Sequence, residues 1–243
     1  MATRRTADSE VAGGLLGESS ARLLRTVDRF EADDWSGPSG LPRWSRAHVV
    51  AHLALNAEAL TRVLRALVSD DGPAPMYDSD EARDTDIGAL AAADPDEIRT
   101  RQMGASTLFE EAVAAVPDDR WTTVVERTPG GRTMRADSLP GMRLRELEIH
   151  HVDLDAGYTT RDWTEGFAIL LLTAMSKRLD PPERFEVRPL DVDRTWVLGP
   201  GDAGADAAVV TGPAADLGWW LTGRPAPDTV SCSRGELPSI EGW

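Results

Sequence analysis

Apolar residues recur at the three- and four-residue spacing of an amphipathic helix through most of the first 157 positions. This spacing predicts helices over residues 10–30, 46–69, 79–92, 94–116 and 140–157. Ser45, Ser79 and the Asp94-Pro95 pair stand where three of these helices begin, and they are of the residue types that cap helix N-termini. The first part of the chain is therefore predicted to be all-α.

Two interruptions of this pattern predict other structure. Residues 33–43 are rich in glycine and proline and predict a loop, whereas two Thr- and Val-containing runs around the Pro129-Gly-Gly131 turn predict a β-hairpin over residues 122–136. After a further helix over residues 164–179, short valine-rich runs predict strands at 185–190, 195–198, 207–211 and 229–233, with a helix at 214–222. We expect an all-α first domain (1–158) and a smaller α+β second domain (159–243).

Composition narrows the function classes. The net charge of −15 argues against nucleic acid or an anionic membrane as partner. The longest apolar run, residues 167–175, is too short to cross a bilayer, and residues 1–8 are polar and unlike a signal peptide, so we expect a cytoplasmic protein. Cys232 is the only cysteine, which excludes an intramolecular disulfide and a multi-cysteine zinc site. We interpret it as a small buried apolar residue rather than a nucleophile.

All four histidines lie in two of the predicted helices. His52 shares one helix face with His48 and Asn56, because residues four apart in a helix lie nearly above one another. In the same way Glu146, His150 and Asp153 share a face of the second helix. If these faces meet inside a bundle, two imidazoles and one carboxylate converge, which is typical of a catalytic metal site with open positions. His52, Glu146 and His150 are therefore the predicted ligands.

Other polar residues near this pattern keep alternative interpretations. His48 is a fourth ligand, a group that orients a ligand, or neither, and Asp153 either orients a ligand imidazole or is simply a carboxylate at a helix end. We expect Glu148 and His151 to pair with each other on a solvated face. Arg224 is either a cation at a helix C-terminus or a carboxylate anchor.

Three segments and two pairs of residues together resemble the mycothiol-dependent maleylpyruvate isomerases. They are residues 41–57, 75–83 and 142–154, followed by Gly223-Arg224 and Gly235-Glu236. The resemblance implies a DinB-type four-helix bundle followed by a smaller α+β domain. It also implies zinc held by His52, Glu146 and His150, mycothiol as a cofactor, and Arg224 reaching the active site from the second domain, with Arg83 as a further substrate-binding residue.

We therefore expect a monomeric enzyme that isomerises maleylpyruvate, or a close cis-alkene dicarboxylate, to fumarylpyruvate by reversible addition of the mycothiol thiol. No cysteine of the chain suits this role, and a zinc ion with open positions lowers the pKa of a bound thiol. One alternative keeps metal and thiol but transfers mycothiol to another electrophile. A second is a non-catalytic DinB-type protein that binds a metal or a small molecule.

Overall fold

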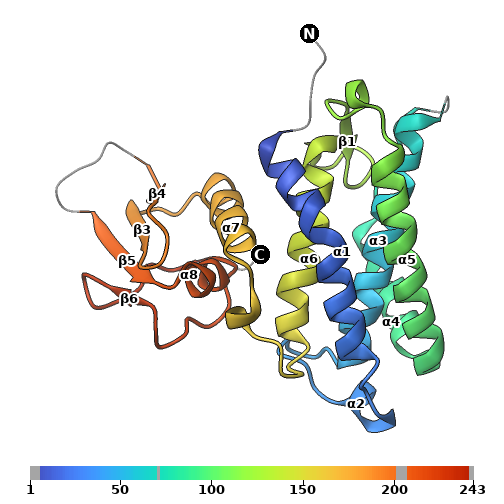
Figure 1. Cartoon of the computed structure of the whole chain (residues 1–243), viewed down its shortest axis with the longest axis horizontal. Coiled ribbons are helices and arrows are strands. Elements are labelled where there is room, and N and C mark those ends of the chain that lie inside the picture. Colours follow the sequence, from blue (N-terminus) through green and yellow to red (C-terminus); the bar gives the residue numbers. More distant parts are fainter. Residues whose placement is uncertain (1–5, 70–71, 201–206, 241–243) are drawn as a thin grey trace. The chain divides into compact units, whose positions relative to one another are not determined.

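Four long helices surround the core of the first unit. They are α1 (Ala7–Val27), α3 (Arg46–Val68), α5 (Pro95–Ala115) and α6 (Leu139–Asp153). In this computed structural model, which describes residues 6–69, 72–200 and 207–240, α1 packs on α5 and α6, and α3 packs on the same two helices, which closes a four-helix bundle (Figure 1). A fifth helix, α4 (Asp80–Ala91), lies against α3. The structure thus confirms the predicted bundle.

The predicted helix starts are confirmed by their caps. The Ser45 hydroxyl accepts a hydrogen bond from the His48 backbone N–H, and Ser79 and Asp94 cap α4 and α5 in the same way. Each cap satisfies one backbone donor that the first helical turn leaves unpaired. Because the cap at Ser45 fixes where α3 begins, it also fixes which face of α3 carries His52.

The prediction that residues 33–43 form a loop throughout was partly wrong. A short helix, α2 (Ala32–Ser36), occupies its beginning and packs on α3. Glu31 and Asp34 form a reciprocal capping box around it, and the buried Trp35 anchors it. A helix this short contains too few apolar repeats to show a helical pattern in the sequence, and the glycines and prolines that follow it predict a loop.

The predicted hairpin is present as β1 (Val124–Glu126) and β2 (Thr133–Arg135), which pair antiparallel. It lies between two 3-10 turns, η1 (Asp118–Arg120) and η2 (Ala136–Ser138). The backbone N–H groups of Met76 and Tyr77 donate to the carbonyls of Glu126 and Arg127. The hairpin therefore holds the segment before α4 in place, and with it the largely buried side chain of Tyr77.

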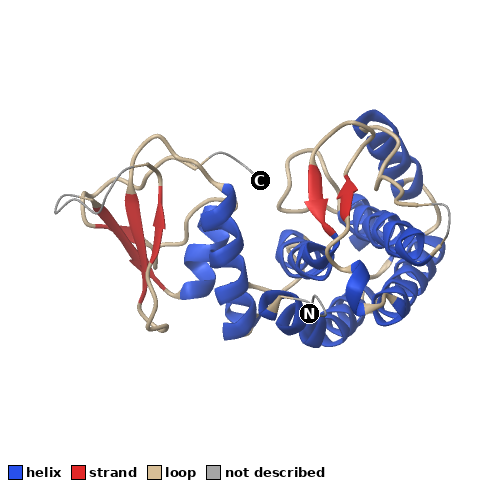
Figure 2. Cartoon of the chain, turned by 90° about the horizontal axis from the view of Figure 1, so that it is seen from above, coloured by secondary structure: helices blue, strands red, loops and turns tan. Residues whose placement is uncertain are grey.

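The second unit, Thr159–Trp243, is a small sheet with helices on one face (Figure 2). The strands are β3 (Phe185–Pro189), β4 (Trp196–Leu198), β5 (Ala208–Gly212) and β6 (Ser231–Cys232), in the order β4-β3-β5-β6. β3 and β5 are parallel, and β4 and β6 pair antiparallel to their neighbours. Helices α7 (Glu165–Arg178) and α8 (Ala214–Leu221) contact this sheet and each other, after the 3-10 turn η3 (Thr160–Asp162). The predicted α+β character is confirmed.

Within the described ranges, none of the helices combines the length and apolar character that a membrane span requires.

Candidate metal centre

His52, Glu146 and His150 converge in the bundle, as their helical spacing predicts. His52 comes from α3, whereas Glu146 and His150 come from consecutive turns of α6. The Nε2 atom of His52 lies 2.9 Å from Oε2 of Glu146, and the Nε2 atom of His150 lies 3.2 Å from the same oxygen. The two imidazole rings are 4.8 Å apart between centroids and nearly perpendicular. Two imidazole nitrogens and one carboxylate oxygen thus face a common point.

Burial and hydrogen bonding set the charges of this cluster. Burial lowers the pKa of His52 to about 4, against the opposing influence of Glu146. Burial would raise the pKa of Glu146, but the hydrogen bonds from His150 and His52 outweigh it and hold that pKa well below its usual range. Glu146 is therefore an ionised carboxylate at neutral pH, and His52 is uncharged, which are the protonation states that metal coordination requires.

The donor set fits a divalent metal. One nitrogen from each imidazole and one carboxylate oxygen all lie within 4.8 Å of one another. Two histidines and one carboxylate form a recurrent ligand set of catalytic zinc sites, in which a position remains open for a thiol, water or substrate atom. A fourth ligand from the chain is not needed for this type of site.

Asp153 orients one of the imidazoles. Its Oδ2 lies 2.8 Å from Nδ1 of His150, and its side chain is almost entirely buried. A carboxylate at Nδ1 keeps the proton on that nitrogen and leaves Nε2 to face Glu146. Of the two interpretations left open by the sequence, the structure favours the orienting role.

We expect Asp153→Asn to weaken metal binding by about 10- to 100-fold while the fold is retained, because ligand-orienting carboxylates contribute at that level. Competition with a chelator of known affinity measures the change. Asp155→Asn is the matched control, since Asp155 is exposed just beyond the same helix and has a positive φ that asparagine tolerates. Equal affinities for the two variants would contradict the orienting role.

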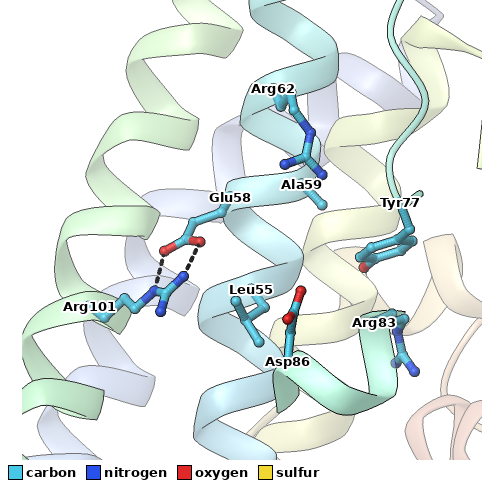
Figure 3. A pocket seen from close by; sticks show the side chains of 8 residues that line it. All are labelled: Leu55, Glu58, Ala59, Arg62, Tyr77, Arg83, Asp86 and Arg101. Carbon is cyan, nitrogen blue, oxygen red and sulfur yellow. Dashed lines mark hydrogen bonds and ion pairs between the residues drawn. The ribbon is translucent and has the colours of Figure 1, made fainter. Parts of the chain in front are cut away.

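Arg83 reaches the cluster from α4. Its Nη2 lies 3.2 Å from Nδ1 of His52, and its guanidinium lies 5.8 Å from the ring centroid of Tyr77. Arg83 and Tyr77 also line a pocket of about 160 Å³ between α3, α4 and α5, which the Glu58–Arg101 ion pair borders on its other side (Figure 3). The structure therefore brings Arg83 next to the predicted ligands.

His48 has a structural role at the start of α3. Its Nδ1 lies 2.8 Å from the Ser45 hydroxyl and 3.3 Å from the Ser45 backbone nitrogen, so its side chain completes a reciprocal cap with Ser45. Its ring also lies beside Trp44. The metal-type cluster found among the described residues consists of His52, Glu146 and His150 without it.

The prediction that Glu148 and His151 pair on a solvated face was wrong, because both side chains are buried. Glu148 accepts hydrogen bonds from Ser19, Arg22 and Tyr158, at 2.8 Å from the arginine and 2.5 Å from the tyrosine. Helix α1 covers this side of α6, and a sequence does not reveal which faces of a helix its neighbours cover.

His151 Nε2 lies 2.8 Å from the Thr26 hydroxyl, and its ring stacks on Tyr158 with a centroid distance of 3.7 Å. Neither contact involves the cluster of His52, Glu146 and His150. His151 therefore belongs to the contact between α1, α6 and the end of the first unit.

Arg224 and Cys232 belong to the second unit. Arg224 follows Gly223, which has a φ of 81°, and its guanidinium lies 5.2 Å from the ring centroid of Trp219. Cys232 is in β6 and is half-buried, so the prediction of a buried cysteine was wrong. A two-residue strand at the edge of a sheet covers its side chains only on one side.

Sequence reasoning missed one buried cation, Arg143. It is completely buried on α6, and its Nη1 donates to the Leu53 carbonyl and to Oδ1 of Asn56. The available signal was its position: Arg143 lies three residues before Glu146 and so falls on the inward face of the same helix.

Comparison with known proteins assigns the family. Residues 16–155 match the family model described as the mycothiol maleylpyruvate isomerase N-terminal domain. The whole chain is similar to crystal structures of a mycothiol-dependent maleylpyruvate isomerase and of a histidine-to-alanine mutant of it, with TM-scores of 0.82 and 0.83, 27% identity and 97% of each chain covered. The chain belongs to the mycothiol-dependent maleylpyruvate isomerase family, and this likeness supports an isomerase of that type.

The chain is also similar to proteins of Mycobacterium tuberculosis. Uncharacterized proteins of strains CDC 1551 and H37Rv are each 30% identical to the chain over 232 residues, which covers 88% of this chain and 86% of theirs. The similarity thus includes the second unit as well as the bundle.

Proposed function

We propose that this protein is a zinc- and mycothiol-dependent cis–trans isomerase that converts maleylpyruvate, or a close cis-alkene dicarboxylate, to fumarylpyruvate. The observation that carries the proposal is the buried convergence of His52, Glu146 and His150 in a chain that belongs to the mycothiol-dependent maleylpyruvate isomerase family. A cis double bond rotates only while it is temporarily single. Reversible addition of a sulfur nucleophile to the alkene produces that state, and loss of the same sulfur restores the double bond.

The roles of the chain's own residues follow from their positions. His52, Glu146 and His150 would hold the zinc, and Asp153 would keep His150 oriented. When bound, zinc lowers the pKa of a coordinated thiol, and mycothiol supplies the sulfur that Cys232 is poorly suited to provide. Arg224 and Arg83 would bind the substrate carboxylates, since a guanidinium matches a carboxylate with two parallel hydrogen bonds. We propose that the second unit contributes to the active site through Arg224, and that the enzyme is monomeric.

The direct test follows the ultraviolet absorbance of maleylpyruvate mixed with the zinc-loaded protein, with and without mycothiol. Conversion to the trans isomer that requires mycothiol is the expected result. A zinc-loaded protein that leaves maleylpyruvate unchanged, but consumes mycothiol in the presence of another electrophile, would replace the isomerase by a mycothiol S-transferase. The absence of any thiol-dependent turnover would indicate a non-catalytic metal-binding protein.

We expect Arg224→Ala to lower kcat/KM for the dicarboxylate by about 10- to 100-fold, because a hydrogen bond to a charged group contributes roughly 1.5–3 kcal/mol. Arg224→Lys should recover little of this loss, since an ammonium group cannot make the paired contact. Steady-state kinetics with maleylpyruvate measure both variants.

Arg194→Ala is the matched control for Arg224→Ala. Arg194 is an exposed arginine of the same unit whose guanidinium also lies over a tryptophan ring, 4.7 Å from the centroid of Trp196. Its removal should leave kcat/KM unchanged. Full activity of Arg224→Ala would point to a substrate without carboxylates.

A further inference from the structure

The proposed metal site takes its ligands from only two helices. His52 lies on α3, and Glu146 and His150 lie on α6. The distance between Glu146 and His150 is set by the geometry of α6 itself. Their distance to His52, however, depends on the separation and the register at which α3 and α6 pack. A shift of about 1 Å along either axis would exceed the tolerance of metal–ligand distances, which is roughly 0.2 Å. Something must therefore fix these two helices at the level of the ligands.

Arg143 is placed to do this. Its Nη1 donates to the carbonyl of Leu53 at 2.8 Å and to Oδ1 of Asn56 at 3.0 Å. Leu53 directly follows His52, and Asn56 lies one turn further along α3. Arg143 itself stands one turn before Glu146 on α6. One guanidinium thus joins the two helices within a single turn of the ligands on each.

The surroundings of Asn56 extend this link. Burial raises the pKa of the Tyr77 hydroxyl, whereas the nearby Asn56 and Arg83 both lower it, and Arg83 contacts Nδ1 of His52. The second amino group of Arg143 lies 3.5 Å from the Ser106 hydroxyl on α5. Arg143 therefore bonds to groups of α3 and lies near α5, while Asn56 is close to Tyr77.

Stability alone does not account for an arginine at this position. Arg143 has no exposed surface, and among the described residues its guanidinium bonds to uncharged groups, while Glu146 and Glu110 act on it only from a distance. Burial lowers its pKa to about 10, so the guanidinium is still charged at neutral pH. Enclosing a charge without a paired partner costs several kcal/mol, and apolar side chains of similar size often replace buried charged groups without loss of stability. The buried arginine is therefore better explained by a role in positioning.

We propose that Arg143 is a positioning residue of the metal centre, which fixes the register of α3 and α6 through Leu53 and Asn56 so that His52 meets Glu146 and His150. This inference rests on the metal site of the proposed function. It does not depend on the identity of the alkene or of the thiol.

The test compares Arg143→Met and Arg143→Lys with the unaltered full-length protein. Affinities for zinc and cobalt(II) are measured by chelator competition, and the visible absorption of the cobalt(II) form reports the coordination geometry. For Arg143→Met we expect the affinity for both metals to fall by about 10- to 100-fold, as for other groups that orient metal ligands without binding the metal. We also expect an altered absorption spectrum of the cobalt(II) form. Arg143→Lys, which keeps one donor, should restore part of the affinity.

The matched control is Glu148→Gln. Glu148 is buried on α6 as well, but it bonds to Ser19 and Arg22 of α1 rather than to α3. This variant should lose stability and keep the affinity and cobalt spectrum of the unaltered protein. A folded Arg143→Met with unchanged affinity and spectrum would overturn the proposal. An equal loss of affinity in Glu148→Gln would also overturn it, since general destabilisation would then explain both.

If Arg143→Met does not fold, Asn56→Ala tests the same link from α3. It removes one of the two acceptors of Arg143, and we expect a smaller loss of affinity in the same direction; unchanged affinity and spectrum would contradict the inference. All readouts are taken without substrate or thiol. Metal binding by the unaltered protein without turnover of maleylpyruvate would contradict only the proposed reaction, whereas failure to bind zinc or cobalt(II) would overturn both.

Discussion

Replacing any one of His52, Glu146 and His150 by alanine is expected to leave the protein folded, free of metal and inactive. Each variant keeps only two of three donors, and two donors on a buried scaffold do not retain zinc against a chelator. Glu146→Gln should have the same effect with almost no change of shape, because it removes the charge on which the Nε2 atoms of both histidines converge. The metal content of the purified proteins and the isomerisation of maleylpyruvate measure the result.

His151→Ala is the control within the same helix. His151 follows His150 directly, but it contacts Thr26 and Tyr158. We expect this variant to hold its metal and to lose about 2 kcal/mol of stability, as for a buried side chain with one hydrogen bond. Full metal occupancy in any of the three ligand variants, or a metal-free His151→Ala protein, would show that the ligands were assigned wrongly.

Glu148→Ala is expected to have the largest effect on stability, a loss of about 3 kcal/mol of the free energy of unfolding, without loss of metal. The carboxylate is 2% exposed and accepts hydrogen bonds from Ser19, Arg22 and Tyr158. Its removal leaves the Arg22 guanidinium, which is 20% exposed, without its closest partner. Urea denaturation followed by circular dichroism measures the change.

Glu18→Ala provides the comparison for this variant. Glu18 also forms an ion pair with Arg22, but at 3.8 Å and with a largely exposed side chain. Its removal should cost less than about 0.5 kcal/mol, as is usual for surface ion pairs. If the two variants were equally stable, burial of Glu148 would contribute nothing.

The helical phase of the sequence was sufficient to predict that the three proposed metal ligands converge. Glu146 and His150 are four residues apart on one predicted helix, and His52 lies on the inward face of another; the structure brings all three together. Helix periodicity carries this information because the side chains that face a bundle interior repeat with the turn of the helix. The caps at Ser45 and Ser79 are local in sequence and were predicted for the same reason.

The predictions that were wrong or missing concern side chains whose partners are remote in sequence. Glu148 and His151 look like a surface pair in their own helix, but α1 covers them from more than 100 positions away. The sequence around Arg143 does not reveal its contact with Leu53 and Asn56, which are about 90 residues distant. A polar residue on a helix says little about its environment until the neighbouring helix is known.

The division of the proposed ligands between α3 and α6 also has a consequence for the order of folding. Glu146 and His150 come together as soon as one helix forms, which takes about a microsecond in isolated peptides. His52 is 94 residues from Glu146, so its approach requires closure of a long chain segment and docking of α3. A nascent chain therefore presents a weak two-donor site first, and acquisition of a firmly held ion reports that the bundle has closed.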